Sequence, residues 1–113
     1  MTRYLISFPG NAMNFPEEEG PDVADGAHAV IQEAKDAGVY LFAGGLDEGV
    51  DPVMVAGDGT VTAGTYPETK ELSGGLTVVD VPSRDAALEW AAKIAAACRC
   101  AQEVREFQFD PLV

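Results

Sequence analysis

Basic residues are scarce in this sequence. Seven Lys and Arg stand against 19 Asp and Glu, which gives the 113 residues a net charge of −12. Such a field repels nucleic-acid phosphates and anionic lipid headgroups, so direct binding to nucleic acid or to a membrane surface is not expected. The sequence also lacks an apolar run of the roughly 18–20 residues that span a membrane. A signal peptide is not expected either, because the first apolar run is short and is broken at Pro9. These features predict a cytoplasmic protein.

Cysteine and histidine are almost absent. Cys98 and Cys100 are one residue apart, and a bridge between them would close a strained ring, so they do not indicate a disulfide framework. A Cys-x-Cys metal site needs further soft or imidazole ligands, and His28 is the single histidine. We therefore expect two reduced structural thiols, no metal and no other cofactor. The motifs of serine hydrolases, phosphate-binding loops and dinucleotide-binding folds are missing as well.

The sequence contains several short apolar segments and two helical patterns. Strand patterns occur at residues 3–8, 39–43, 53–56, 60–62, 76–81 and 104–109. Helical spacing predicts one helix from an N-cap at Asp22 to Gly38, and a second helix capped by Ser83 with an outward Glu89–Lys93 pair. This order predicts one domain over residues 1–113. We expect an α+β, ferredoxin-like fold, in which both helices cover one face of an antiparallel sheet.

Two of the predicted strands are hydrophobic on both faces. Residues 39–42 and 53–56 are apolar at consecutive positions, whereas the two helices can cover only one face of a sheet. An exposed apolar sheet face is a liability on a monomer. We therefore expect a homodimer in which two sheets pack face to face as a dimeric α/β barrel, with a small-molecule pocket between helix, sheet and partner. The alternative is a monomer whose loop 10–21 folds over the open face.

Two features of the sequence could carry chemistry. His28 lies at the edge of the apolar stripe of the first predicted helix, where an imidazole can act as a general base or orient a ligand. From its position alone, the simpler interpretation is a boundary residue that caps a backbone carbonyl or lies in solvent. Residues 63–71 form a polar segment between two strands that includes Gly64, Tyr66, Glu68 and Lys70. That segment is either a solvated hairpin loop or the lip of a cleft in which Lys70 meets an anionic substrate group.

This polar segment also carries a family resemblance. Residues 61–71, followed by Gly74-Gly75 and Asp80-Val81, resemble the DGPF-motif branch of the YCII-related family, and the likeness continues through residues 86–92 and 103–105. The resemblance implies a dimeric α+β barrel related to muconolactone isomerase-type proteins. It also implies a catalytic pair made of an aspartate and a histidine on the first helix, which matches the helix of His28.

The sequence departs from the DGPF motif at the catalytic position. Ala63 replaces the motif aspartate, Thr65 its proline and Tyr66 its phenylalanine. The change to Ala63 removes the carboxylate that would orient an imidazole and stabilise its charged form. Either another acid, Asp47 or Asp80, takes its place, or the pocket is kept without the pair. Tyr66 could then donate its hydroxyl to a substrate oxygen.

Three functions follow from these features. The first is an enzyme that performs acid/base chemistry on a small polar metabolite such as a lactone or enol, with His28 as base and with Tyr66 and Lys70 at an oxyanion. Glu68, Gly64 and Tyr4 complete the candidate ligand-binding set. The second is a non-catalytic ligand-binding or regulatory dimer that acts through a basic protein partner, since relatives of the DGPF branch are often linked with sigma factors. The third is a structural dimer without a ligand.

Overall fold

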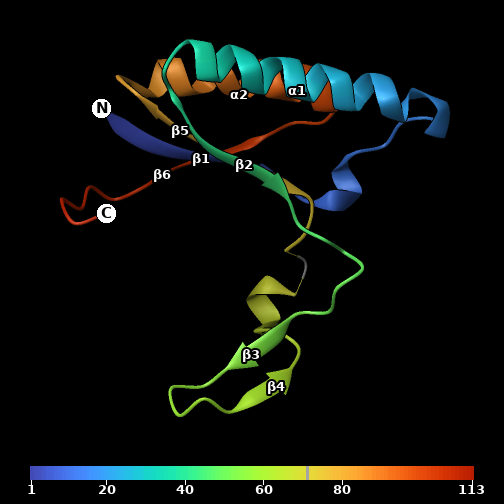
Figure 1. Cartoon of the computed structure of the whole chain (residues 1–113), viewed down its shortest axis with the longest axis vertical. Coiled ribbons are helices and arrows are strands. Elements are labelled where there is room, and N and C mark those ends of the chain that lie inside the picture. The colour runs from blue at the N-terminus through green and yellow to red at the C-terminus, as the bar shows by residue number, and fades with distance from the viewer. Residues whose placement is uncertain (71) are drawn as a thin grey trace.

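The structure is a computed structural model that describes residues 1–70 and 72–113 (Figure 1). The main sheet contains β1 (Thr2–Phe8), β2 (Tyr40–Gly45), β5 (Gly75–Val81) and β6 (Glu103–Glu106). The helices are α1 (Gly20–Asp36) and α2 (Arg84–Cys98), and a separate hairpin joins β3 (Val53–Val55) to β4 (Val61–Ala63). Short 3-10 turns lie at Gly10–Ala12, Glu17–Glu19 and Pro67–Thr69.

The main sheet confirms the predicted α+β class. Its strand order is β2-β5-β1-β6 and every neighbouring pair is antiparallel. Both helices lie on one face of it (Figure 1). Alternate residues of β1 and β5, such as Ile6 and Val79, are fully buried against that helix layer, and Ala87 and Ala91 of α2 allow the helix to approach closely. Each such buried aliphatic side chain stabilises the fold by about 1.5–3 kcal/mol.

The helix ends confirm one prediction and correct another. Ser83 caps α2 as expected, because its Oγ accepts a hydrogen bond of 3.1 Å from the Ala86 N–H. Asp22 is not a cap: α1 already begins at Gly20, with Pro21 in its first turn. Proline is suited to that position since its missing N–H would have no helical partner there. Asp22 lies instead in the first turn, where a negative charge is favourable beside the helix dipole.

Two further expectations need correction. Lys93 pairs with Glu33 of α1, rather than with Glu89 of its own helix, and lies 4.8 Å from the centre of the Trp90 ring. The ion pair therefore joins the two helices. The last strand ends at Glu106 instead of continuing to residue 109. Residues 107–113 form a C-terminal tail with an exposed Phe109.

The sheet face away from the helices is open. Leu5, Phe42, Leu76 and Val78 belong to that face by their register, and the Phe42 side chain is 57% exposed. Loop 10–21 does not cover it, because Met13 packs against the core on the helix side. The loop thus does not take the position that the monomer alternative predicted for it.

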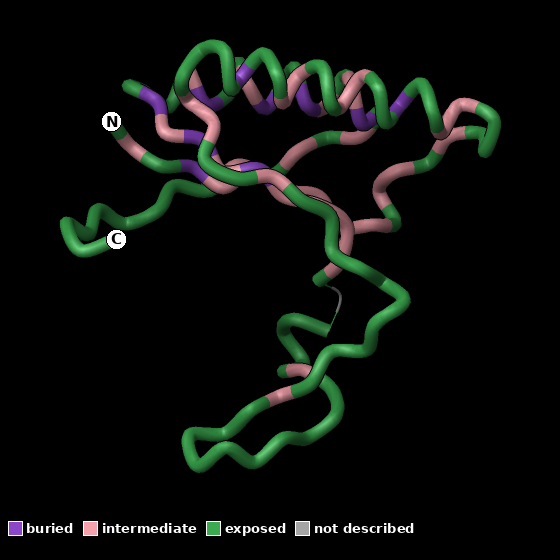
Figure 2. The backbone as a smooth tube through the Cα atoms, in the orientation of Figure 1, coloured by how far each residue is buried: buried purple, intermediate pink, exposed green. Residues whose placement is uncertain are grey.

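The β3–β4 hairpin belongs to an arm (residues 47–70) that leaves the main sheet instead of joining it as a further strand. The arm is exposed along nearly its whole length (Figure 2). The Leu46 N–H bonds to the Gly74 carbonyl at 2.7 Å and so holds the base of the arm together. Inside the arm, Val55 pairs with Val61 across the hairpin, and both side chains are exposed.

The arm makes the chain more extended than a compact domain. The radius of gyration is 15.8 Å, against about 13 Å for a compact chain of this length. The accessible surface is 7833 Å², against about 5,900 Å² for a folded monomer of 11.9 kDa. The chain therefore exposes roughly 1,900 Å² more than its mass requires.

Candidate functional site

A cavity of about 480 Å³ lies where the helix layer meets the ends of β1, β2 and β5. Most of its wall is apolar and is formed by Phe8, Met13, Val30, Ile31, Tyr40 and Ile94. Three polar groups join this wall: the imidazole of His28, the carboxylate of Glu48 and the hydroxyl of Thr77. The cavity therefore combines an apolar lining with a few acid–base groups, which is typical of small-molecule sites.

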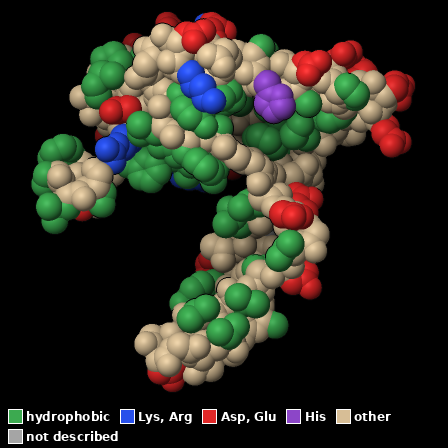
Figure 3. Space-filling view, viewed as in Figure 1, with side chains coloured by type: hydrophobic (Ala, Val, Ile, Leu, Met, Phe, Trp, Pro, Cys, Tyr) green, Lys and Arg blue, Asp and Glu red, His purple; other side chains and the backbone are tan. Residues whose placement is uncertain are grey.

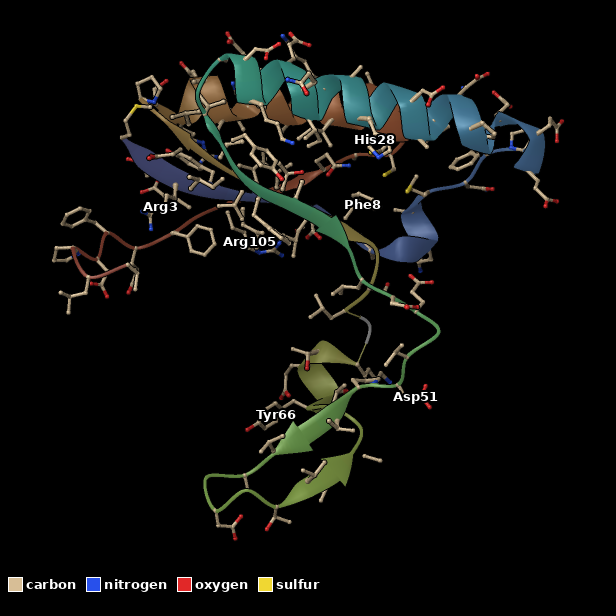
Figure 4. All side chains as sticks on the ribbon, viewed as in Figure 1. Arg3, Phe8, His28, Asp51, Tyr66 and Arg105 are labelled. Carbon is tan, nitrogen blue, oxygen red and sulfur yellow. The ribbon has the colours of Figure 1, made fainter. Side chains whose placement is uncertain are left out.

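His28 reaches the cavity from α1. The helix turns Ala27, Val30 and Ile31 toward the sheet, and His28 lies beside them at the rim, exposed to solvent. Its side chain points from the underside of α1 toward Phe8 at the end of β1 (Figure 4). At this position an imidazole can exchange protons both with a molecule in the cavity and with water.

Glu48 supplies the carboxylate of the cavity. The Gly74 N–H donates a hydrogen bond of 3.3 Å to Glu48 Oε1. The same oxygen lies against Gly10, where an added Cβ would come within 2.0 Å of it. The Gly74 N–H thus binds the carboxylate at the edge of the cavity. Gly10 leaves room for it there, since any side chain at position 10 would displace it.

The sequence predicted other acids for this role. Asp47 accepts a hydrogen bond of 2.9 Å from the Gly49 N–H and does not line the cavity. Asp80 lies opposite Arg3 in the β1–β5 ladder and faces away from the helices. Neither acid is close enough to the cavity to contribute to its wall. Glu48 was missed because nothing in the sequence distinguishes it from the neighbouring Asp47. Only the path of the chain after β2 decides which of the two carboxylates faces the cavity.

Glycine pairs shape the floor of the cavity. Gly74 has a φ of +78°, and a Cβ there would come within 2.2 Å of the Phe8 carbonyl oxygen. A Cβ on Gly75 would lie 3.3 Å from the Gly44 carbonyl oxygen. The Gly10 N–H donates a hydrogen bond of 2.9 Å to Ser73 Oγ. The chain segments around the cavity thus approach one another more closely than other residues would allow.

The two cysteines are free thiols, and Cys98 forms part of the rear wall. Burial, and then the nearby Cys100, raises the pKa of the Cys98 thiol. The thiol is therefore protonated at neutral pH and behaves as a small apolar side chain rather than a nucleophile. Among the described residues, no group of three His, Cys, Asp or Glu side chains is placed to hold a metal ion.

Four predicted ligand-binding residues lie on the arm, away from His28. Lys70 lines a second hollow of about 1170 Å³ at the base of the arm, and this hollow shares Gly10 and Glu48 with the His28 cavity. Gly64, Tyr66 and Glu68 line neither of these two hollows. Of the four, the structure thus brings only Lys70 near the cavity.

Tyr4, the remaining candidate, is a core residue. It is 4% exposed, and its hydroxyl donates a hydrogen bond of 3.1 Å to Glu106 Oε1. Burial, and then this hydrogen bond, raises the pKa of the Tyr4 hydroxyl. Tyr4 does not line the His28 cavity.

The fold and the cavity define a small ferredoxin-like α+β domain with a single-histidine pocket. The chain belongs to the YCII-related family, whose domain matches residues 10–108. Its fold is similar to that of 5-chloro-2-hydroxyhydroquinone dehydrochlorinase from Burkholderia phenoliruptrix AC1100, solved in complex with 2,5-dihydroxybenzoquinone. The two chains are 14% identical with a TM-score of 0.53, and the match covers 96% of this chain and 95% of that one. No curated protein is significantly similar in sequence.

The finer assignment to the DGPF-motif branch stays a prediction. None of the helices in the described residues has the length and apolar character needed to cross a membrane.

Proposed function

We propose that this protein binds a small cyclic metabolite with an ionisable oxygen in the His28 cavity and catalyses a proton transfer on it. One observation carries the proposal: the single histidine and a held carboxylate, Glu48, line the same otherwise apolar cavity. Perturbed or positioned acid–base groups in a concave apolar site are the usual mark of such chemistry.

The proposed roles follow from the two side chains. His28 takes a proton from an acidic C–H or O–H of the ligand and returns it to another atom, because an imidazole titrates nearest to neutral pH. Glu48 favours the transient imidazolium and so takes the part that Ala63 cannot play. A positioned acid–base group of this kind accelerates a reaction by about 10²–10⁴-fold.

The cavity also indicates the class of ligand. Its volume of about 480 Å³ and the rings of Phe8 and Tyr40 suit a flat oxygenated ring, such as a lactone, an enol or a hydroxylated quinone. The structurally similar dehydrochlorinase was solved with a dihydroxylated quinone, which supports this choice. Lys70, in the adjoining hollow, would bind an anionic substituent of a larger ligand.

We further propose that the working unit is the homodimer predicted from the sequence. The open face carries the exposed Phe42 and the half-buried Leu5, Leu76 and Val78. The excess surface of the chain is larger than the roughly 800 Å² per partner of a standard interface. Covering an apolar face of this kind is the main driving force of stable association. Packing two open faces together would give the barrel that the family resemblance implies.

The test follows a proton directly. Unsaturated five-membered lactones and 2,5-dihydroxybenzoquinone are incubated with the protein in D₂O, and NMR measures deuterium incorporation into the ligand. We expect His28→Ala to slow exchange at least about 100-fold and Glu48→Gln about tenfold, with affinity changed less than exchange. Asp25→Asn, an exposed change on the same helix, is the matched control. If a probe binds and His28→Ala leaves its exchange rate unchanged, the catalytic role is wrong.

The same experiment tests the alternative function. A ligand that binds the wild-type protein, but is neither exchanged nor converted, would favour a non-catalytic ligand-binding or regulatory dimer acting through a protein partner. In that case His28→Ala should weaken binding without any change in turnover.

A further inference from the structure

The arm has no support of its own. An isolated two-stranded hairpin is at best marginally stable in water. The register places Val53, Val55, Val61 and Ala63 on one face of the hairpin, and all four are exposed. An apolar hairpin face of this kind needs a surface to pack on, and the described part of this chain provides none.

A matching surface lies at the other end of the open sheet face. Between β1 and the C-terminal tail there is a hollow of about 370 Å³, here called the tail hollow, which is lined in part by Arg3, Asp80, Phe107 and Phe109. Asp80 Oδ1 is buried there and has no hydrogen-bond partner among the described residues. A buried carboxylate oxygen without a donor is costly, so a rearrangement of Asp80 that gave it a donor would stabilise this end of the sheet.

The two surfaces carry side chains of opposite charge. The arm carries five carboxylates and one lysine: Asp47, Glu48, Asp51, Asp58, Glu68 and Lys70. Arg3 and Arg105 lie on the side of the sheet away from the helices, which is also the side toward which the arm with Tyr66 extends (Figure 4). Arg105 bonds to Glu103 at 3.0 Å but stays more than half exposed. Arg3 lines the tail hollow together with the carboxylates of Asp80 and Asp110, so it and Arg105 are two single positive sites for the acidic arm. A two-fold axis would repeat each contact between the arm and these arginines.

The shape of the molecule fits the same arrangement. In Figure 3 the arm and the C-terminal tail stand off from the body on one side, and hydrophobic side chains line the body between them. The roughly 1,900 Å² of surface in excess of a compact monomer is about twice what one standard interface takes from each partner, so the sheet faces alone need not account for it.

We propose that the arm of each subunit docks in the tail hollow of the other, so that the homodimer is held by two reciprocal arms in addition to its sheet faces. The occupant is a second copy of this chain. Its hairpin valines pack on Phe107, and its carboxylates meet Arg3 and Arg105. This inference rests on the proposed homodimer and adds which segments cross between subunits.

Photo-crosslinking tests the placement. Tyr66, which is 65% exposed, is replaced by p-benzoylphenylalanine in the full chain, and ¹⁵N-labelled and unlabelled subunits are mixed before irradiation. We expect mixed-isotope crosslinks from position 66 to residues 1–8 or 103–113. The same probe at Leu88, on α2, should give no such crosslinks. Crosslinks only within one chain, between the two arms, or to the partner's helices would overturn the proposal.

Charge-reversal substitutions provide a second test. Arg3→Glu should weaken dimerisation about tenfold, because a two-fold axis repeats each lost contact. Arg84→Glu changes the net charge equally but lies on α2, and it should change dimerisation less than threefold. Combining Arg3→Glu with Asp51→Lys and Glu68→Lys should restore affinity. Equal weakening by Arg3→Glu and Arg84→Glu, without restoration, would contradict the docking.

The outcomes separate this inference from the proposal beneath it. A wild-type protein that sediments as a monomer at micromolar concentration overturns the homodimer and the arm exchange together. A stable dimer whose crosslinks lie elsewhere overturns the arm exchange alone. Proton exchange in the His28 cavity is measured independently of both.

Discussion

The body and the arm use the same kinds of residue in opposite ways. In β5 the valines at 79 and 81 are fully buried under α2, whereas in the hairpin Val53, Val55 and Val61 are all more than half exposed. Strand-forming sequence alone does not decide which of these outcomes follows. The difference is that the body strands lie beside two helices of the same chain, while the arm extends beyond their reach. The surfaces that this chain leaves uncovered are therefore as informative as its core.

The strongest test of this comparison is one substitution made in both regions. Val79→Asp places a charge without a partner in the centre of the core, so we expect a loss of more than about 4 kcal/mol and failure to fold. Val55→Asp, on the exposed hairpin face, should leave the far-UV circular dichroism spectrum and the fold of the body intact. It should instead weaken dimerisation, measured by sedimentation velocity. Loss of the body fold in Val55→Asp would show that the arm is part of the core.

A second test compares two glycines with positive φ. Gly74, in the body, has a φ of +78° and no room for a Cβ, which would lie 2.2 Å from the Phe8 carbonyl oxygen. Gly64, in the arm, has a φ of +106° and open space around it. We expect Gly74→Ala to cost about 2–4 kcal/mol and Gly64→Ala about 1 kcal/mol, because only the first adds a clash to the backbone strain. Urea unfolding gives both values.

Ligand binding by the two glycine variants extends the comparison between body and arm. Gly74→Ala should also reduce ligand binding, since the clash of its Cβ would shift the backbone N–H that bonds to Glu48 at the cavity. Gly64→Ala should leave binding unchanged, because Gly64 does not line the cavity. Equal stability losses in both variants would mean that the close approach at Gly74 is not required.

Much of the body could be predicted from the sequence because its signals are local. The cap at Ser83 and the helical spacing in α2 correctly marked the second helix. The start of α1 was predicted three residues late, because a good cap residue at Asp22 outweighed the proline before it. The strand predicted at 53–56 is present as Val53–Val55, but its position on an arm outside the main sheet depends on contacts between distant segments.

The site was less predictable for the same reason. His28 stands out as the single histidine, and the structure places it on the cavity. Glu48 has no such signal: it becomes the carboxylate of the cavity only because Gly74 and Gly10 approach it across more than twenty residues of chain. The motif positions on the arm were predicted to bind ligand because of their residue types. Tyr66, however, does not line the cavity and has 65% of its side chain exposed on the arm.

The smallest expected effect compares two polar side chains that each organise a turn. Ser83 caps α2 in the body, so Ser83→Ala should cost about 1 kcal/mol and lower the unfolding midpoint by about 4–8 °C. Asp58 does similar work in the arm, where its Oδ1 accepts a hydrogen bond of 2.9 Å from the Thr60 N–H. The bonds from Thr60 lower the pKa of Asp58 below its ordinary 3.8.

Because the Asp58 pKa is lowered in the folded hairpin, its contribution is present above about pH 4 and is lost as the pH falls through the folded value. At neutral pH, Asp58→Ala should therefore loosen the hairpin turn without moving the unfolding midpoint of the body. Calorimetry measures the midpoint, and amide hydrogen exchange at Thr60 measures the turn. If Asp58→Ala lowered the midpoint as much as Ser83→Ala does, the arm and the body would unfold as one cooperative unit, and the hairpin would have to be supported by its own subunit rather than by a second copy.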